Sequence, residues 1–371
     1  NWFATPGMEP RYEYTYGRQN WFEASAGEHR AVREAVGLFD QSSFGKTLIS
    51  GPDAERVLNR ICANDIAVEP GRVVYTQWLN DRGGIEGDVT VTRLDETRYM
   101  VVSAAADQMR DLEWAERQIP GDARCVATDV TASWAVLNVQ GPASRELISR
   151  ISPADLSNEA FPYMTSQEIE VGLGVARAFR VTYMGELGYE LHVPTDQVQH
   201  VYDELMAASE GLGLRHAGYH ALNSLRIEKA YRFWGYDIGD EDTPLEAGLG
   251  FAVAWDKPGG FIGREALLRL RETGLQRRLV VFSVDDPEPL VYGNEPIWRD
   301  GVLVGRTASG WYGHTLGRSI ALGYVDSGAP GAATSEWLLG GRYELELANE
   351  RFAVTPSLRP LYDPKGERVR A

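Results

Sequence analysis

The chain has 371 residues, of which 43% are hydrophobic and 24% are charged, proportions that are ordinary for a globular protein of two or three domains. Its formal net charge of −16 and pI of about 4.9 argue against nucleic acid or an anionic membrane as the main partner, because both need a basic face. An acidic protein can still bind an anionic ligand in a local basic pocket.

The sequence carries few signals for metals, disulfides or membranes. Cys62 and Cys125 are far apart and in no metal-ligand spacing, so we expect two small buried side chains and no metal site. No run of about 18 apolar residues and no signal peptide is visible. We therefore expect a cytoplasmic location, or the mitochondrial matrix in a eukaryote. The chain begins at Asn1 and not at Met, so we expect it to be a piece of a longer polypeptide, a processed product or a trimmed chain.

In chain order, an aromatic-rich stretch covers the first 25 residues, and a helix is predicted over 28–38 with Gly37 as its stop. The next predicted strands and helices alternate up to about residue 275: strands at 47–49, 73–79, 87–94, 98–103, 134–139, 166–171, 176–183 and 189–193, and helices opened by Pro52 and over 108–118, 143–151, 197–209 and 217–229. After residue 276, short strand patterns separated by glycine turns indicate a β-barrel or sandwich with no long helix. The fold class is therefore α+β with an all-β C-terminal domain.

Residues 77–91 are predicted to form a strand, a tight glycine turn and a second strand, because Asn80-Asp81 and Gly83-Gly84 are turn sequences. Glu86, Asp88 and Thr90 alternate onto one face of the second strand. From this pattern alone, a surface carboxylate is the commoner interpretation of Asp88, and a proton acceptor held in a site is the alternative. Glu86 is an equal candidate by pattern.

Residues 181–191 again predict a strand, a glycine turn and a strand, with Tyr183 and Glu190 flanking the turn. An aromatic ring beside a carboxylate suits a flat, nitrogen-rich heterocycle, because the ring stacks and the carboxylate accepts two N–H hydrogen bonds. An aromatic–acid pair on a strand surface fits the same residues equally well.

Several common chemistries are absent from the sequence. It contains no Walker A loop, no G-x-G-x-x-G that opens a helix after a strand, no H-E-x-x-H and no G-x-S-x-G. His216 and His220 are spaced i,i+4, but no third metal ligand is near them in sequence. Nothing indicates that this chain supplies a nucleophile or binds a dinucleotide.

Six blocks in this order together resemble the folate-binding aminomethyltransferase family, which includes the glycine-cleavage T-protein and the C-terminal halves of dimethylglycine and sarcosine dehydrogenases and oxidases. The blocks are residues 37–43, 79–91, 137–142, 183–190, 225–229 and 244–249. Three further stretches resemble the dehydrogenase and oxidase branch more than free-standing T-protein: residues 14–22, 310–317 and 360–366.

The resemblance implies a three-domain, T-protein-like ring of α+β domains and a C-terminal β-barrel around a central folate channel. A split α+β domain would comprise residues 1–46 and 138–245. A second α+β domain, carrying the catalytic aspartate, would comprise 47–137 and 246–275, and the barrel 276–371.

The resemblance also assigns the candidate site. It implies that Asp88 is the catalytic residue, next to N10 of tetrahydrofolate, and that Val89 beside it belongs to the folate-binding residues. It implies that Glu190 recognises the pterin and that Tyr183 and Tyr163 are aromatics of the folate site.

The resemblance also implies that Phe251 and Arg226 bind folate. Phe251 stands where some relatives carry tyrosine, so it keeps the ring and loses the hydroxyl group. Arg226 lies in a matching block, but the run Leu225-Arg226-Ile227-Glu228 equally suits a buried structural ion pair.

The implied function is tetrahydrofolate-dependent transfer of the carbon of an oxidised N-methyl amine, such as dimethylglycine or sarcosine, to give 5,10-methylenetetrahydrofolate. Tetrahydrofolate would be bound by this chain, and FAD only by a missing domain before Asn1 or by a separate flavin-dependent partner. The alternatives are a stand-alone T-protein or folate-dependent demethylase, a non-enzymatic folate-binding protein, and a domain that has lost activity.

Overall fold

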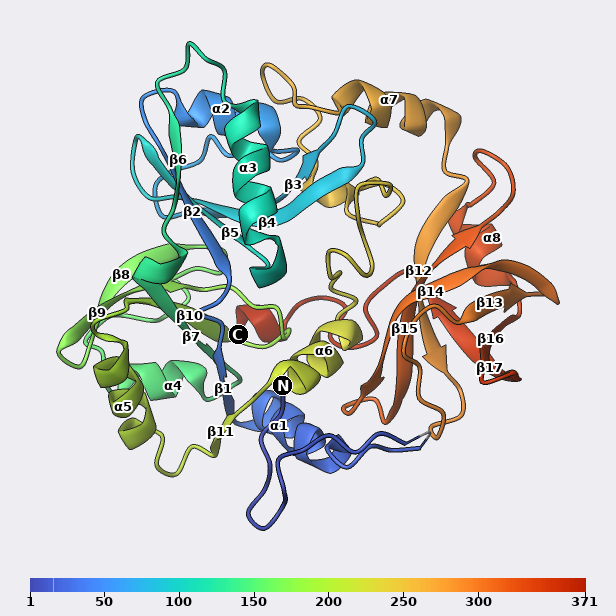
Figure 1. The fold of residues 1–371 in the computed structure, drawn as a ribbon, viewed down its shortest axis with the longest axis horizontal. Helices are drawn as coiled ribbons and strands as arrows, with labels where there is room; N and C mark the ends of the chain where they lie inside the picture. The colour runs from blue at the N-terminus through green and yellow to red at the C-terminus, as the bar shows by residue number, and fades with distance from the viewer. Residues whose placement is uncertain (16) are drawn as a thin grey trace.

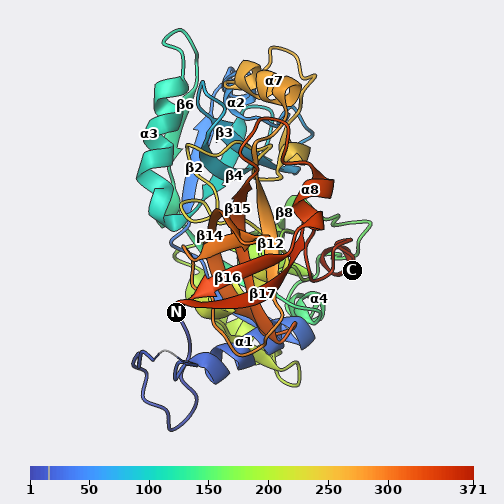
Figure 2. The ribbon, with the colours of Figure 1, turned by 90° about the vertical axis from the view of Figure 1, so that its right-hand side faces the viewer.

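A computed structural model describes residues 1–15 and 17–371 of the chain. Three lobes lie around a centre that contains helix α6 and the C-terminal segment (Figure 1). Seen edge-on, the molecule is much thinner, so the lobes form one layer (Figure 2). Two lobes are α+β and the third is a closed barrel. The predicted α+β fold with three lobes is therefore confirmed.

The first lobe is a six-stranded sheet of order β11-β1-β7-β10-β9-β8, antiparallel except for the pairing of β1 with β11. Its strands are β1 (Val36–Asp40), β7 (Trp134–Gln140), β8 (Ser166–Val171), β9 (Gly174–Phe179), β10 (Gly188–Pro194) and β11 (Leu214–His216). The helices of this lobe are α1 (Phe22–Glu34), α4 (Ser144–Ser149), α5 (Val198–Ala208) and α6 (Tyr219–Glu228).

The helix predicted over 28–38 is wrong at both ends. Helix α1 starts at Phe22 and ends at Glu34, and Val36 already begins strand β1 between β7 and β11. A Cβ atom at Gly37 would collide with the Val32 side chain, so Gly37 lets the strand pass close to the end of the helix. Pairing with strands far away in the sequence overrides the local helix signal.

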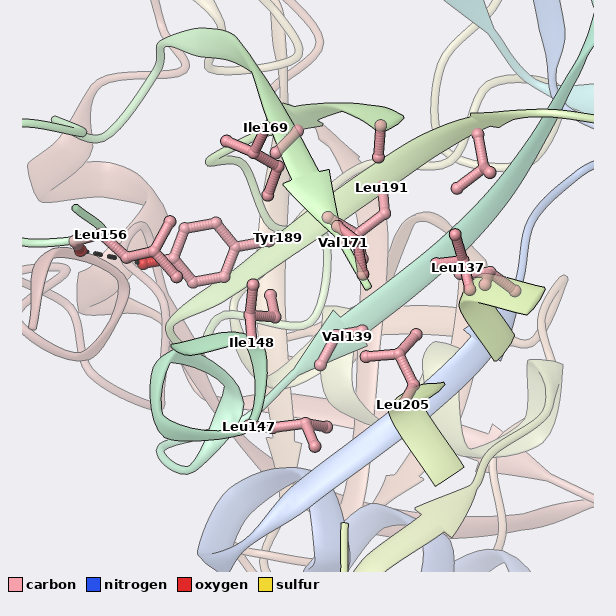
Figure 3. Packing of buried hydrophobic residues seen from close by; sticks show 14 of the residues in the cluster. Leu137, Val139, Leu147, Ile148, Leu156, Ile169, Val171, Tyr189, Leu191 and Leu205 are labelled. Atoms are coloured by element: carbon pink, nitrogen blue, oxygen red, sulfur yellow. Dashed lines mark hydrogen bonds between the residues drawn. The ribbon is translucent and has the colours of Figure 1, made fainter. Parts of the chain in front are cut away.

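The two faces of this sheet have different roles. Leu137, Val139, Tyr189 and Leu191 point to one face, where they pack with residues of α4, α5 and β8 (Figure 3). Because strand side chains alternate, Asn138 and Glu190, which pair in register, point to the opposite face. This second face is turned away from the lobe's own core.

The second lobe is a five-stranded sheet of order β3-β4-β5-β2-β6. It comprises β2 (Gly45–Ser50), β3 (Val73–Leu79), β4 (Ile85–Arg93), β5 (Arg98–Ser103), β6 (Val126–Asp129), α2 (Ala54–Ile61), η1 (Ala105–Asp107), α3 (Gln108–Gln118), η2 (Thr131–Ser133), η3 (Gly250–Ala252) and α7 (Arg264–Thr273). Trp78 stacks on Trp114 of α3, with ring centroids 5.2 Å apart, and anchors the helix to the sheet. The chain enters the second sheet at β2, which begins at Gly45, and returns to the first sheet at β7, which begins at Trp134. Both positions lie a few residues before the predicted domain boundaries of 47 and 138.

The third lobe is a closed barrel of order β12-β15-β14-β13-β16-β17. It comprises β12 (Arg277–Val284), β13 (Pro296–Arg299), β14 (Val302–Gly313), β15 (Arg318–Asp326), α8 (Ser335–Gly340), β16 (Tyr343–Leu347) and β17 (Glu350–Ser357), and η4 (Arg368–Arg370) follows it. Closure leaves no open sheet edge, and the predicted barrel is confirmed. None of the described helices is long and apolar enough to span a bilayer.

Residues 231–249 connect all three lobes and are called here the central segment. Its Asp240 carbonyl accepts a hydrogen bond from Asn80 of the second lobe at 3.1 Å. Its Asp242 and Glu246 pair with Arg277 of the barrel, each at 2.9 Å. This segment therefore fixes the hairpin β3–β4 relative to the other two lobes.

Candidate functional site

The turn between β3 and β4 is built as the sequence predicts. Asn80 Oδ1 accepts hydrogen bonds from the backbone N–H groups of Arg82 and Gly84, each at 3.0 Å, and Gly83 has a φ of +86°. A Cβ atom at Gly84 would overlap the carbonyl oxygen of Asp240. Glycine at position 84 therefore allows the turn to contact the central segment directly.

Asp88 lies on β4, half-buried, with its carboxylate held by two neighbours from β3. Gln77, its direct cross-strand partner, donates from Nε2 to Asp88 Oδ1 at 2.9 Å. The Tyr75 hydroxyl also donates to this carboxylate, since Tyr75 and Gln77 lie on the same face of β3. Burial raises the pKa of Asp88 to about 6, although the hydrogen bonds and the charge of Arg232 act in the opposite direction.

Glu86 shares a face with Asp88 but has different partners. Its carboxylate accepts a hydrogen bond from Asn80 of the turn at 3.1 Å, and its backbone carbonyl accepts one from Arg110. The indole of Trp234 covers this end of β4, because Arg110 stacks on its ring and its Nε1 donates to the Ile85 carbonyl at 2.9 Å. Glu86 therefore supports the turn. Asp88, in contrast, is held beside Tyr75 and lies near the positive charge of Arg232.

Tyr183, which belongs to the first lobe, lies near Asp88 and its neighbours in the second lobe. Its hydroxyl donates to the backbone carbonyl of Arg232 at 2.7 Å, and its ring stacks on Tyr231 with centroids 5.9 Å apart. Burial raises the pKa of Tyr183, and the negative charge of Asp88 contributes in the same direction. The structure thus brings Tyr183 and Asp88 together across two lobes through Arg232.

The other two predicted aromatics extend this group. Phe251, with 77% of its surface exposed, stacks on Tyr75 with ring centroids 6.3 Å apart. Tyr163 is half-buried, and its hydroxyl raises the pKa of Tyr231, for which burial is the larger cause. Aromatic rings therefore lie on both sides of Asp88 and Arg232.

Glu190 lies on the inner face of the first sheet in a separate polar environment. Its carboxylate is 3.7 Å from His192 Nε2, and its charge acts on the buried Lys46. Burial lowers the pKa of Lys46 to about 8 and also lowers the pKa of His192. His192 is 1% exposed and packs on Phe179, with ring centroids 4.4 Å apart.

Two predicted folate-binding side chains are turned away from this group. Val89 is 2% exposed and packs in the core of the second lobe, on the face of β4 opposite Asp88. Arg226 is 1% exposed and donates to Asp237 Oδ2 at 2.7 Å and to Ser309 Oγ at 3.2 Å. Arg226 is thus a buried ion pair that joins α6, the central segment and the barrel.

The sequence interpretation missed Tyr75, Gln77 and Arg232. The first two had a usable signal, because pairing β3 with β4 across the predicted turn places Gln77 opposite Asp88 and Tyr75 two residues further along the same face. Arg232 is far away in sequence, and no local pattern marks it.

The Glu190 side of the site contains buried polar atoms without hydrogen-bond partners in the described part of the chain, which bear on whether a pterin fits there. Gln140 Oε1 and Gln41 Nε2 are buried and have no partner among the described residues, although both side chains are joined through Asn138. A Cβ atom at Gly188 would collide with the Gln140 amide, so this glycine makes room for it. Because these amide atoms are fully buried, a ligand does not reach them in this structure, and Glu190, whose side chain is 16% exposed, is the group of this set that a ligand can contact.

These observations define a class: an α+β protein of three lobes that holds a half-buried carboxylate of raised pKa beside aromatic rings. Among the described residues, no three His, Cys, Asp or Glu side chains are grouped to hold a metal.

Residues 1–257 match the GCVT N-terminal domain, and residues 277–363 match the glycine cleavage T-protein C-terminal barrel domain. The chain belongs to the glycine-cleavage T-protein family, a family of folate-dependent one-carbon transfer.

Several relatives match along the whole chain. It is 45% identical over 370 residues to 4-methylaminobutanoate oxidase (formaldehyde-forming) of Paenarthrobacter nicotinovorans, covering 100% of this chain and 44% of the relative. It is 36% identical to mitochondrial sarcosine dehydrogenase of Mus musculus, covering 100% of this chain and 43% of the relative. The chain therefore spans less than half the length of these relatives.

The fold is also that of a solved T-protein. The crystal structure of glycine cleavage system aminomethyltransferase T from Bartonella henselae superposes with a TM-score of 0.81 at 24% identity, over 95% of this chain and 94% of that chain.

Proposed function

We propose that this chain transfers the carbon of an oxidised N-methyl amine to tetrahydrofolate, forming 5,10-methylenetetrahydrofolate. The observation that supports this most directly is Asp88, a half-buried carboxylate whose pKa is raised to about 6 between Tyr75, Gln77 and Arg232. A carboxylate with a pKa near neutrality can take up a proton during the reaction and release it afterwards. The family membership supports tetrahydrofolate as the acceptor of the carbon.

Folate supplies two nucleophilic N–H nitrogens that together receive the carbon. In the balanced reaction, an iminium carbon and the two folate N–H groups give the methylene bridge, the free amine and one proton. Asp88 accepts that proton, and its negative charge stabilises positive charge that develops on the attacking nitrogen. Gln77 and Tyr75 fix the carboxylate orientation through their hydrogen bonds.

The remaining residues bind and shield the reactants. Tyr183 and Phe251 offer rings for stacking on either side of the reacting position. Glu190, whose side chain is 16% exposed, accepts hydrogen bonds from N–H groups of the pterin edge. Holding both reactants in this partly buried site keeps the hydrolysable carbon away from water.

The oxidation that produces the iminium requires an electron acceptor, which we assign to a flavin-dependent unit outside this chain. The support is that both relatives are named as an oxidase or a dehydrogenase and are more than twice as long as the matched region. We propose the amine to be sarcosine, dimethylglycine or 4-methylaminobutanoate, because each of the three appears in the name of a relative. A stand-alone aminomethyltransferase is the second candidate, favoured by 38% identity to the aminomethyltransferase of Halothermothrix orenii over 82% of this chain and 84% of that relative.

The proposal is tested by following carbon from amines labelled with ¹³C in the N-methyl group. A flavin-dependent oxidase that lacks a folate-binding part oxidises the amine in the presence of tetrahydrofolate and dimedone, which traps free formaldehyde. Addition of this chain should raise the fraction of label that NMR detects in methylenetetrahydrofolate above the spontaneous level.

Variants separate binding from chemistry in the same assay. Asp88→Asn should still bind 5-formyltetrahydrofolate in calorimetry but return the labelled fraction to the spontaneous level, whereas Glu86→Gln, if stably folded, should keep the transfer. Absence of folate binding by the native chain, or normal transfer by Asp88→Asn, would refute the proposal. Transfer from an aminomethyl-lipoyl carrier, but not from oxidised N-methyl amines, would establish the second candidate.

A further inference from the structure

Arg232 lies in the central segment just after helix α6, which ends at Glu228, and its side chain is half-buried. The guanidinium group donates from Nη1 to the carbonyl of Ala230 at 2.6 Å, and from Nε and Nη2 to the carbonyl of Ala247 at 3.0 and 2.7 Å. A Cβ atom at Gly248 would lie 2.9 Å from Nη2, so glycine makes room for the guanidinium group. Backbone carbonyls therefore hold this cation in place.

Among the described residues, the guanidinium group of Arg232 has no carboxylate within ion-pair distance. Two other arginines near the central segment differ, because Arg226 pairs with Asp237 at 2.7 Å and Arg277 pairs with two carboxylates at 2.9 Å each. Of the five N–H donors of a guanidinium group, three are used by the two carbonyls that hold Arg232. Within the described part of the chain, Arg232 thus keeps an uncompensated charge and N–H donors for a ligand.

Arg232 joins the group around Asp88 from two sides. Tyr183 donates to the backbone carbonyl of Arg232 at 2.7 Å, and the loop that the guanidinium group contacts leads into η3, where Phe251 stacks on Tyr75 beside Asp88. Burial raises the pKa of Asp88 and of Tyr75, and the charge of Arg232 acts on both in the opposite direction. Asp88 and Arg232 form no ion pair with each other in the described structure, so a ligand can use both charges.

An iminium made from an N-methyl amino acid has two charged ends, a positive carbon–nitrogen end and a carboxylate. Asp88 suits the first end, because a carboxylate stabilises a neighbouring cation. Arg232 suits the second end, because a guanidinium group offers a fork of donors that matches a carboxylate. Sarcosine, dimethylglycine and 4-methylaminobutanoate, the amines in the names of the relatives, all carry a carboxylate.

We propose that Arg232 binds the carboxylate of the iminium and is a specificity-determining residue of the transfer. The inference rests on the proposed function, since it assumes that the iminium carbon reacts beside Asp88. Arg232 handles no proton in this role; it orients the iminium so that its carbon points toward the folate nitrogens. The chain would consequently prefer carbon donors that carry a carboxylate over those that lack one.

The test uses product inhibition of transfer from ¹³C-labelled sarcosine at saturating tetrahydrofolate, with oxygen uptake recording the oxidase separately. Glycine, the amine released from sarcosine, keeps the carboxylate, whereas ethanolamine has a hydroxyl group in its place. Glycine should inhibit transfer by the native chain about tenfold more strongly than ethanolamine, which corresponds to one charge-assisted contact. Equal inhibition by the two amines, or none by either, would overturn the inference.

Variants assign the discrimination to Arg232. Arg232→Met should abolish it and lower the transferred fraction about tenfold when the iminium is limiting, with a smaller loss when the iminium is abundant. Arg232→Lys keeps the charge and should retain part of the discrimination. Arg278→Met is the matched control, because Arg278 is also half-buried and its pKa is lowered by burial and by the charge of Arg232. It should keep the discrimination, and loss of discrimination in both methionine variants would contradict a direct contact with Arg232.

Calorimetry with 5-formyltetrahydrofolate distinguishes the carboxylate of the amine from the carboxylates of folate. Arg232→Met should bind this folate within about threefold of the native affinity. A much larger loss of affinity would show that Arg232 binds folate itself, which overturns the inference and leaves the proposed function standing. Circular dichroism verifies folding; if Arg232→Met does not fold, Arg232→Lys and the two amines on the native chain still decide the outcome. No folate binding by the native chain would instead refute the proposed function.

Discussion

Replacing Asp88 by asparagine should stabilise the ligand-free protein in a pH-dependent manner. Burial raises the pKa of Asp88 from 3.8 to about 6, so the folded state binds the proton more tightly than the unfolded state. The stability contributed by the protonated form is complete below pH 3.8 and is lost as the pH rises through 6. At 1.36 kcal/mol per pKa unit, ionised Asp88 costs about 3 kcal/mol well above pH 6.

The free-energy cost of ionising Asp88 changes between pH 5 and pH 8. About half of the cost is already present at pH 5, so the advantage of Asp88→Asn over the native chain should grow by about 1.4 kcal/mol between pH 5 and pH 8. Because Asp88 is half-buried, solvent screening makes this an upper value.

Urea unfolding at pH 5, 6, 7 and 8 measures the difference, provided that the slopes of the two proteins agree. Asp111→Asn is a useful control, since burial also raises the pKa of Asp111 to about 6, but Asp111 lies on α3 and pairs with Arg110 at 2.7 Å instead of with Tyr75 and Gln77. The Asp111→Asn variant should show the same pH dependence of stability as Asp88→Asn, and it should keep one-carbon transfer. An Asp88→Asn advantage that is the same at pH 5 and pH 8 would refute the reasoning.

Three further outcomes follow from the same structure. The rate of transfer at limiting folate should rise about tenfold per pH unit below pH 6 and level off above it, as a pH–rate profile of the native chain would show. Tyr75→Phe removes a hydrogen bond that lowers the pKa of Asp88, so the midpoint of that profile should move upward by up to about 1 pH unit; a downward shift would contradict the assignment. Gly84→Ala should destabilise the chain by about 2–3 kcal/mol in urea unfolding, because its methyl group would overlap the Asp240 carbonyl, whereas Gly121→Ala, with open space around it, should change little.

Local patterns carried enough information to predict the hairpin and the all-β character of the third lobe. The alternation of residues 85–93 and the turn chemistry of Asn80 and Gly83 fix β3, β4 and the register that places Gln77 opposite Asp88. The strand and turn signals after residue 276 similarly indicate the strands of the third lobe, although they fit a barrel or a sandwich equally. The hairpin and the individual strands depend on neighbours in sequence, whereas barrel closure depends on the distant pairing of β12 with β17.

The choice between Asp88 and Glu86 could not be made in this way. What separates them is Arg232 and the turn side chain of Asn80, and the position of Arg232 depends on packing between lobes. The β1 strand was missed for a related reason, since its partners β7 and β11 lie about a hundred or more residues away. The folate-binding roles of Tyr163, Tyr183, Glu190 and Phe251 stay predictions.

The central segment has a consequence for how this molecule unfolds. Each lobe has its own apolar core, which would ordinarily allow three separate melting transitions. Arg226 and Asp237 are buried against Ser309 of the barrel, and Asp242 and Glu246 are neutralised by Arg277 of the barrel. Removing the barrel would leave Asp242 and Glu246 without Arg277 and would uncover the Arg226–Asp237 pair, so the three cores should melt cooperatively in calorimetry, and a fragment ending before residue 276 should not persist as an independent folding unit.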